Sequence, residues 1–181
     1  IYGVKSAVDI VYLRLICDDM VTHRLLSEEF DEIDYQLIAV HTTIEDFRLA
    51  YFINKCLNIN LAKHPEDISL EENKREIHFS RFFFQDDENS ISWDLIQNKS
   101  QDDQSSATLS TGLFANTVSK VSTKTYLIPE FKKVDYFLKV DNEFTEKELL
   151  ETISKLKKIY KVSTVYNIDA EKIKSKNNLI F

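Results

Sequence analysis

The spacing of apolar residues predicts short strands interrupted by two amphipathic helices. Residues 33–40, IDYQLIAV, carry apolar side chains at odd and even positions, which predicts a strand covered on both faces. Thr42 and Glu45 then have the spacing of a capping box, which opens a helix. We expect that helix to bury one stripe of side chains, formed by Phe47, Ala50, Tyr51, Ile53, Asn54 and Leu57.

An aromatic hairpin is predicted in the middle of the chain. IHFSRFFF at residues 77–84 and ISWDLI at 91–96 read as two strands, and DDENS at 86–90 supplies turn-forming residues between them. The hairpin places aromatic side chains on both faces of the predicted sheet, namely Phe82, Phe83, Phe84 and Trp93. We expect these side chains to pack in the core, and the alternative is that those on the second face form an interface with a partner. A polar stretch near residues 98–112 follows, and its length and composition predict a mobile loop.

The last third of the chain predicts another strand and another helix. TYLIPEF at residues 125–131 is expected to be extended, because Pro129 restricts the residue before it and cannot donate to a sheet. VDYFLKV at 134–140 reads as a strand, and Thr145 with Glu148 forms a second capping box. A final strand, VSTVYNI at 162–168, follows a helix whose buried stripe is expected to hold Leu149, Ile153, Leu156 and Tyr160.

These elements predict an α+β fold, with a mixed or largely antiparallel sheet and two amphipathic helices packed mainly on one face. Residues 32–57 and 133–156 share an Asp-Tyr pair, an apolar strand, a threonine capping box and a helix. This order fits either an internal duplication of a strand-helix-strand unit or two ordinary β-α units. The length of 181 residues fits one domain, which we place at residues 20–181.

The first 19 residues are treated separately, because they precede the only methionine, Met20. They lack the basic region, continuous apolar core and small-residue cleavage site of a secretory signal. We interpret them as translated upstream sequence, so that the native domain begins at Met20. The alternative is a fragment of a longer chain in which Val8, Ile10 and Tyr12 belong to a real strand.

Composition and charge narrow the classes of function. The chain has 23 basic and 30 acidic residues, so its formal charge of −7 repels phosphate backbones and anionic lipid as a whole. Residues 145–181 are locally basic, with eight lysines against five acidic residues, which leaves an RNA-binding surface as an alternative to a solvated lysine face. No apolar run reaches the roughly 20 residues that cross a bilayer, so we expect no membrane partner.

Several common kinds of site are excluded or disfavoured by residue type. The chain has only two glycines, which excludes the glycine-rich nucleotide-binding loops and the nucleophile elbow. Cys17 and Cys56 are far apart and form no CxxC pair, so we interpret them as reduced thiols of a cytoplasmic protein. The acidic runs at 86–88 and 102–103 lack the pattern of a calcium loop and read as solvated turns. We therefore expect no metal ion and no cofactor.

A small set of residues forms the candidates for chemistry. His41 ends the first predicted strand, and Glu45 and Asp46 begin the helix after it, where acid-base or metal-binding groups often lie in α/β proteins. The simpler interpretation is that both carboxylates stabilise the helix N-terminus through its dipole. Glu130 and Asp135 complete the set of candidate catalytic residues.

The segment IPEFKKVDY also resembles a known pattern, that of the IPExxxDY family of bacterial proteins from the Bacteroidota. Blocks elsewhere resemble the same family, including LIAVHTTIEDFRLAYFINKCLNINL, SWDLIQNK, TGLF and KSKNNLIF, so the resemblance covers residues 20–181. It implies no enzyme activity, cofactor or catalytic residue, and the frequent neighbourhood of family genes to those for ribonuclease III and pyruvate kinase implies a cytoplasmic role. The motif residues are Ile128, Pro129, Glu130, Asp135 and Tyr136.

The sequence thus favours a non-catalytic cytoplasmic module that binds a protein or a small molecule through its sheet face or its polar loop. One alternative is a small enzyme that uses His41, Glu45, Asp46, Glu130 and Asp135. The other is an RNA-associated factor that uses the basic carboxy-terminal region, although the net charge argues against nucleic acid.

Overall fold

The computed structural model describes residues 35–72, 74–104, 121–141 and 144–181. All of these residues belong to one compact unit, residues 33–181. Residues 1–19 and Met20 lie outside the described ranges, so the interpretation of that segment stays a prediction.

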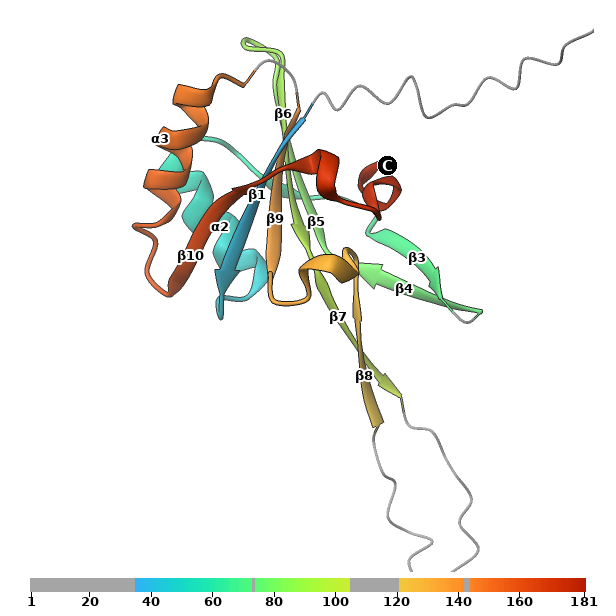
Figure 1. The fold of residues 1–181 in the computed structure, drawn as a ribbon. Coiled ribbons are helices and arrows are strands. Elements are labelled where there is room, and N and C mark those ends of the chain that lie inside the picture. The colour runs from blue at the N-terminus through green and yellow to red at the C-terminus, as the bar shows by residue number, and fades with distance from the viewer. Residues whose placement is uncertain (1–34, 73, 105–120, 142–143) are drawn as a thin grey trace, which may run out of the picture. The chain divides into compact units, whose positions relative to one another are not determined.

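The centre of the fold is a six-stranded sheet in which every neighbouring pair of strands is antiparallel (Figure 1). Its strand order is β10-β1-β9-β6-β5-β2, and the strands are β1 (Tyr35–Thr42), β2 (Ala62–Lys63), β5 (Arg81–Asp86), β6 (Ile91–Gln97), β9 (Tyr136–Asp141) and β10 (Val162–Ile168). Two smaller antiparallel sheets pair β3 (Ile68–Glu72) with β4 (Arg75–Phe79) and β7 (Lys99–Gln104) with β8 (Val121–Tyr126). The predicted α+β class with a largely antiparallel sheet is confirmed.

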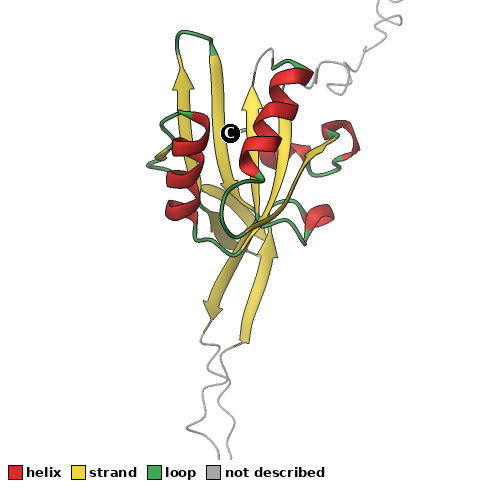
Figure 2. Ribbon diagram, turned by 90° about the vertical axis from the view of Figure 1, so that its left-hand side faces the viewer, coloured by secondary structure: helices red, strands yellow, loops and turns green. Residues whose placement is uncertain are grey.

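Two α-helices cover one face of the main sheet (Figure 2). They are α2 (Asp46–Leu57) and α3 (Glu146–Leu156), which contact each other. Within the described ranges, three short 3₁₀ helices occur later in the sequence, at Pro129–Phe131, Ala170–Lys172 and Lys176–Leu179. No helix in the described part of the chain is long and apolar enough to cross a lipid bilayer.

The sheet carries a hydrophobic core on each face. On β1, Ile38 and Val40 pack with the helices, whereas Leu37 and Ala39 pack on the opposite side. The second core is closed by the β3–β4 hairpin and the carboxy-terminal segment, seen to the right of the sheet in Figure 1. A strand between two cores is apolar on both faces, so the predicted double coverage is confirmed for residues 37–40, which are all buried, while Tyr35 and Gln36 are half-buried.

One of the two predicted capping boxes is wrong and the other is confirmed. Thr42 is still part of β1, and its hydroxyl accepts from Ile44 N at 3.1 Å and donates to the carbonyl oxygen of Lys161 at 3.0 Å. Helix α2 begins later, with Glu45 as an N-cap that makes no side-chain hydrogen bond. At α3, Thr145 and Glu148 bond each other's backbone N–H groups as a capping box requires.

The predicted buried stripe of α2 is wrong for two aromatic residues. Phe47 is 62% exposed and Tyr51 is 60% exposed, while Leu49, Ala50 and Ile53 are buried against the sheet. Apolar residues surround much of this helix, so spacing alone did not determine which side faces the core. On α3 the predicted stripe holds except for Tyr160, which lies beyond the end of the helix at Leu156 and is 76% exposed.

Two further predictions need correction around residues 98–131. The polar stretch expected to form a loop begins instead with strand β7, whose backbone pairs with β8; residues 105–112 lie outside the described part. Ile128 is extended, with φ −118° and ψ 95°, but Pro129 starts a 3₁₀ turn rather than continuing the extended segment. Proline fits that first helical position because its missing N–H has no partner there.

Candidate functional site

The residues around the Pro129 turn are held by a buried asparagine that the sequence analysis did not single out. Asn98 is fully buried, and its side-chain oxygen accepts from Ile128 N at 2.9 Å. Its amide nitrogen donates to the carbonyl oxygens of Phe131 and Val134, at 2.9 and 3.0 Å. Every group of this side chain is therefore occupied by the segment that carries the motif.

Glu130 anchors the carboxy-terminal segment. Its Oε1 accepts hydrogen bonds from the backbone N–H groups of Lys174 and Ser175, both at 2.9 Å, and the Ser175 hydroxyl donates to both carboxylate oxygens. Desolvation raises the pKa of Glu130, but the hydrogen bonds from its own backbone, Ser175 and Lys174 lower it more, so the pKa is below its ordinary value. These hydrogen bonds hold the carboxy-terminal segment against the turn that contains Glu130, and we call them the Glu130 clasp.

Asp135 and Tyr136 join the start of β9 to the end of β1. Asp135 Oδ2 accepts from Thr42 N at 2.9 Å, and its Oδ1 is ion-paired with Lys99. The Tyr136 hydroxyl is buried and donates to the carbonyl oxygen of Ile44 at 3.1 Å. Burial raises the pKa of Tyr136, and the negative charges of Asp46, Asp135 and Glu45 raise it further, so the phenol stays neutral.

A shallow pocket of about 240 Å³ brings two of the candidate carboxylates together. Glu45 and Asp135 line it with Lys99, Tyr136, Thr42, Thr43, Ile44 and Gln97. Both oxygens of Asp135 already have partners, and Asp46 nearby accepts from the Ser80 hydroxyl at 2.7 Å. The pocket therefore presents one carboxylate, Glu45, whose contacts within the described chain leave it exposed to solvent.

His41 and Glu130 lie outside the lining of that pocket. His41 follows Leu37 and Ala39 along the face of β1 that points away from the helices, and its ring stacks on Tyr166 with centroids 5.7 Å apart. Its Nε2 is 3.4 Å from the Tyr166 hydroxyl. The carboxylates of Glu45 and Asp46 belong to the helix side of the sheet, so the predicted trio with His41 is split between the two faces.

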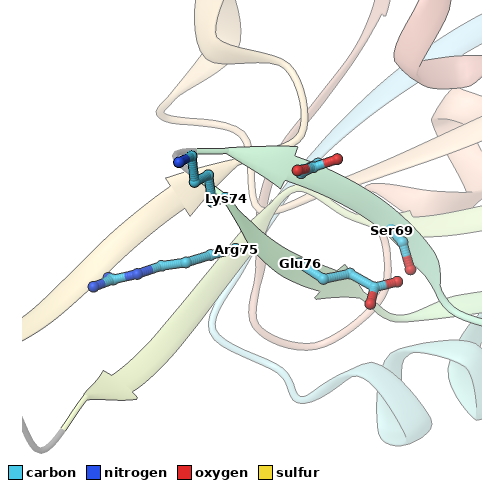
Figure 3. A pocket seen from close by; sticks show the side chains of 5 residues that line it. Ser69, Lys74, Arg75 and Glu76 are labelled. Atoms are coloured by element: carbon cyan, nitrogen blue, oxygen red, sulfur yellow. The ribbon is translucent and has the colours of Figure 1, made fainter.

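Two other pockets are formed mainly by exposed side chains. One, of about 360 Å³, is lined by the charged and polar side chains of a single hairpin, β3–β4 (Figure 3). In Figure 3 the side chains of Lys74 and Arg75 extend away from Glu76 and Ser69 rather than toward a common point. The other, of about 260 Å³, lies between this region and the carboxy-terminal residues Asn177, Asn178, Ile180 and Phe181.

The acidic turn at residues 86–88 has a structural role. Asp86 accepts from the backbone N–H groups of Glu88 and Asn89, and from the Asn89 side chain at 2.8 Å. Within the described ranges, no group of three or more His, Cys, Asp or Glu side chains has the arrangement of a metal site. The side chains of Asp102 and Asp103 are outside what the structure describes.

An exposed aromatic face on α2 is the main surface feature that the sequence analysis misplaced. Phe47 and Tyr51 lie one turn apart, and the exposed residues Arg48 and Lys55 flank them on the same helix. The Phe47 ring makes an edge contact with buried Phe82, with centroids 5.1 Å apart, which fixes its position on the surface. We call these four α2 residues the aromatic face. Of the hairpin aromatics, Phe82 and Trp93 are buried in the core and Phe84 packs against it, whereas Phe83 is half-buried and belongs to neither core.

The basic carboxy-terminal region presents several lysines to solvent. Lys157, Lys158, Lys161 and Lys174 are exposed, while Lys172 is ion-paired with Asp169 at 2.8 Å.

Comparison of the chain with models of protein families finds no match. Comparison with curated proteins likewise finds no similar sequence.

Proposed function

We propose that this protein is a non-catalytic binding module whose partner is another protein, and that the aromatic face of α2 is the contact surface. The observation that carries the proposal is the joint exposure of Phe47 and Tyr51, at 62% and 60% of their surfaces. Large aromatic side chains next to an arginine have the composition of binding hot spots.

The chemistry of the aromatic face indicates the kind of partner. Phe47 and Tyr51 offer apolar area in an i, i+4 arrangement, which suits a groove that receives one side of a helix. Arg48 and Lys55 place positive charge beside that area, so a groove with acidic residues at its rim is the best fit. The partner is thus a folded protein with a hydrophobic, acid-rimmed groove.

The absence of catalysis is supported by the engagement of the candidate groups. Both Asp135 oxygens, the Tyr136 hydroxyl and the Glu130 carboxylate are committed to backbone or lysine contacts that hold the fold together. A catalytic carboxylate needs a free oxygen directed at substrate. The cytoplasmic location and the relationship to the IPExxxDY family belong to the same proposal.

The proposal is tested by affinity capture from native lysate with three baits. They are the wild-type chain, the double variant Phe47→Ser/Tyr51→Ser, and Leu150→Ser, which removes an equally exposed apolar residue from α3. We expect the double variant to lose one defined protein by at least about tenfold, because two hot-spot residues are removed, while Leu150→Ser retains it. Equal capture by all three baits contradicts the proposal, as does recovery of RNA alone in salt-sensitive form.

A further inference from the structure

Strand β10 forms one margin of the main sheet. It pairs with β1 on one side, and in the described chain no strand pairs with its other side (Figure 1). The margin at the other end of the sheet is β2, which has only two residues. β10, with seven residues, is therefore the long exposed edge of this sheet.

The hydrogen-bonding pattern identifies the backbone groups that point outward from β10. The Val40 carbonyl accepts from Asp135 N at 3.2 Å, so Val40 faces β9, and the alternation of an antiparallel ladder turns Ala39 and His41 toward β10. Their partners in the register are Tyr166 and Thr164. The backbone N–H and C=O groups of Val165 and Asn167 consequently point away from the sheet, whereas Ser163 lies at the register shift and its hydroxyl donates to the carbonyl oxygen of His41 at 3.0 Å.

This edge has one feature by which natural proteins prevent strand addition, a register shift with β1 between His41 and Thr42 at the start of β10, and from Thr164 to Ile168 the ladder is regular. Its sequence, VSTVYNI, contains no charged residue, proline or glycine. Ser163, Thr164, Tyr166 and Asn167 are exposed, so side chains on both faces of the strand leave room for a neighbour. An uncharged seven-residue edge is a template for a further antiparallel strand.

We propose that β10 binds β10 of a second copy of this chain, in an antiparallel pair with a two-fold axis at Val165. The outward backbone groups of Val165 then meet those of Val165 in the second copy, and Asn167 lies opposite Ser163. On the face away from the helices, Thr164 lies opposite Tyr166, a favourable cross-strand combination. The two main sheets become one continuous sheet.

Charge complementarity favours a second copy as the occupant. The same register places Lys161 of one copy opposite Asp169 of the other, and the two-fold axis makes this contact twice. Both residues are exposed, and each Asp169 already binds Lys172 of its own chain at 2.8 Å. The pairing thus brings a second cation to each Asp169. It also keeps the lysines that precede β10 in one copy away from the same lysines in the other copy.

The test is sedimentation equilibrium of the full chain over about 1 to 500 µM, the range in which a small interface associates. We expect a monomer–dimer equilibrium. Lys161→Glu should weaken it at least about tenfold, since two attractive pairs become repulsive. Asn167→Pro, which removes an outward N–H that β1 does not use, should also weaken it. Lys174→Glu is the matched charge control and should have no effect.

A second set of variants makes the result decisive. The charge exchange Lys161→Glu/Asp169→Lys restores opposite charges across the axis and should recover association relative to Lys161→Glu. Phe47→Ser/Tyr51→Ser should dimerise as the wild type does, which separates this surface from the aromatic face. A monomer throughout the concentration range overturns the proposal. A dimer that is unaffected by both Lys161→Glu and Asn167→Pro, with circular dichroism unchanged, also overturns it.

Discussion

The side-chain oxygen of Asn98 lies 2.9 Å from the backbone nitrogen of Ile128, and both residues are fully buried. The backbone of Asn98 extends the same connection, since its N–H donates to Asp135 O and its carbonyl accepts from Leu127 N, both at 2.9 Å. One residue thereby holds the two ends of the turn between β8 and β9. The motif segment is positioned by an asparagine 30 residues earlier in the chain.

We expect Asn98→Ala to lower the free energy of unfolding by about 3 to 5 kcal/mol, because it removes the side-chain partner of Ile128 N and of the Val134 carbonyl, both buried, and one of the two donors to the Phe131 carbonyl. Asn98→Asp should be at least as costly, since a carboxylate then faces two carbonyl oxygens. Urea unfolding followed by fluorescence of Trp93, the single tryptophan, measures both. Asn89→Ala, in an exposed turn, is the control and should cost about 1 kcal/mol or less. Equal losses at positions 98 and 89 contradict the assignment.

The Glu130 clasp should make stability depend on pH. Its folded pKa is lowered, so the ionised carboxylate stabilises the fold above the unfolded pKa, near 4.5, and that contribution is lost as pH falls through the folded pKa. We expect the wild type to lose more stability than Glu130→Gln between about pH 5 and pH 3. Urea midpoints at several pH values give the comparison, with Glu76→Gln, on the exposed β4 surface, as control. Parallel curves for wild type and Glu130→Gln would count against the clasp.

The N-termini of α2 and α3 can be compared directly, because α3 has a side-chain cap and α2 does not. Thr145→Ala removes a side-chain cap that bonds Glu148 N, so we expect a loss of about 1 kcal/mol in the free energy of unfolding. Glu45→Ala removes an N-cap residue without a side-chain cap bond and should change stability by about 0.5 kcal/mol or less. Thermal melts of both variants test the difference. A larger loss for Glu45→Ala would be inconsistent with the observed caps.

Asp135 makes two contacts that can be tested separately, a hydrogen bond from the Thr42 backbone and an ion pair with Lys99. Asp135→Ala leaves Thr42 N without its acceptor, and we expect a loss of about 2 kcal/mol. Lys99→Met removes the partly exposed ion pair and a long, exposed hydrogen bond to the Lys133 carbonyl, and it should cost less than about 1 kcal/mol. Denaturant unfolding at low and high salt distinguishes them, because the Lys99 effect should shrink with salt, whereas the part of the Asp135 effect that comes from Thr42 N should remain. Equal costs at low salt would assign the stabilisation to the charges instead.

Local signals predicted the parts of the fold that local interactions determine. The Thr145 capping box is confirmed because its partners lie within three residues, and β1 is confirmed because its composition already reflects two cores. Thr42 has the same local pattern as Thr145, yet its hydroxyl binds Lys161, 119 residues away. A distant contact of this kind leaves no trace in the spacing of nearby residues.

The candidate site was harder to predict than the fold. Asn98 stands in a polar run, NKSQDD, and nothing in that run distinguishes a buried asparagine from a solvated one. On α2, Phe47 and Tyr51 have the same spacing as a buried stripe, and Leu49 and Ile53 compete with them for the core. The aliphatic pair occupies the sheet side, so which aromatic residues reach the surface depends on packing between elements.

The position of β1 in the sheet also affects how the chain is made. Its two neighbours, β9 and β10, are encoded near the other end of the chain, and about 100 residues separate β1 from β9. A ribosome adding about 5 to 20 residues per second needs roughly 5 to 20 s to synthesise that interval. During this time β1, apolar on both faces, has left the ribosome without either neighbouring strand. Completion of the sheet must therefore wait until β9 and β10 have been synthesised, and a chaperone that shields β1 in the interval would favour correct folding.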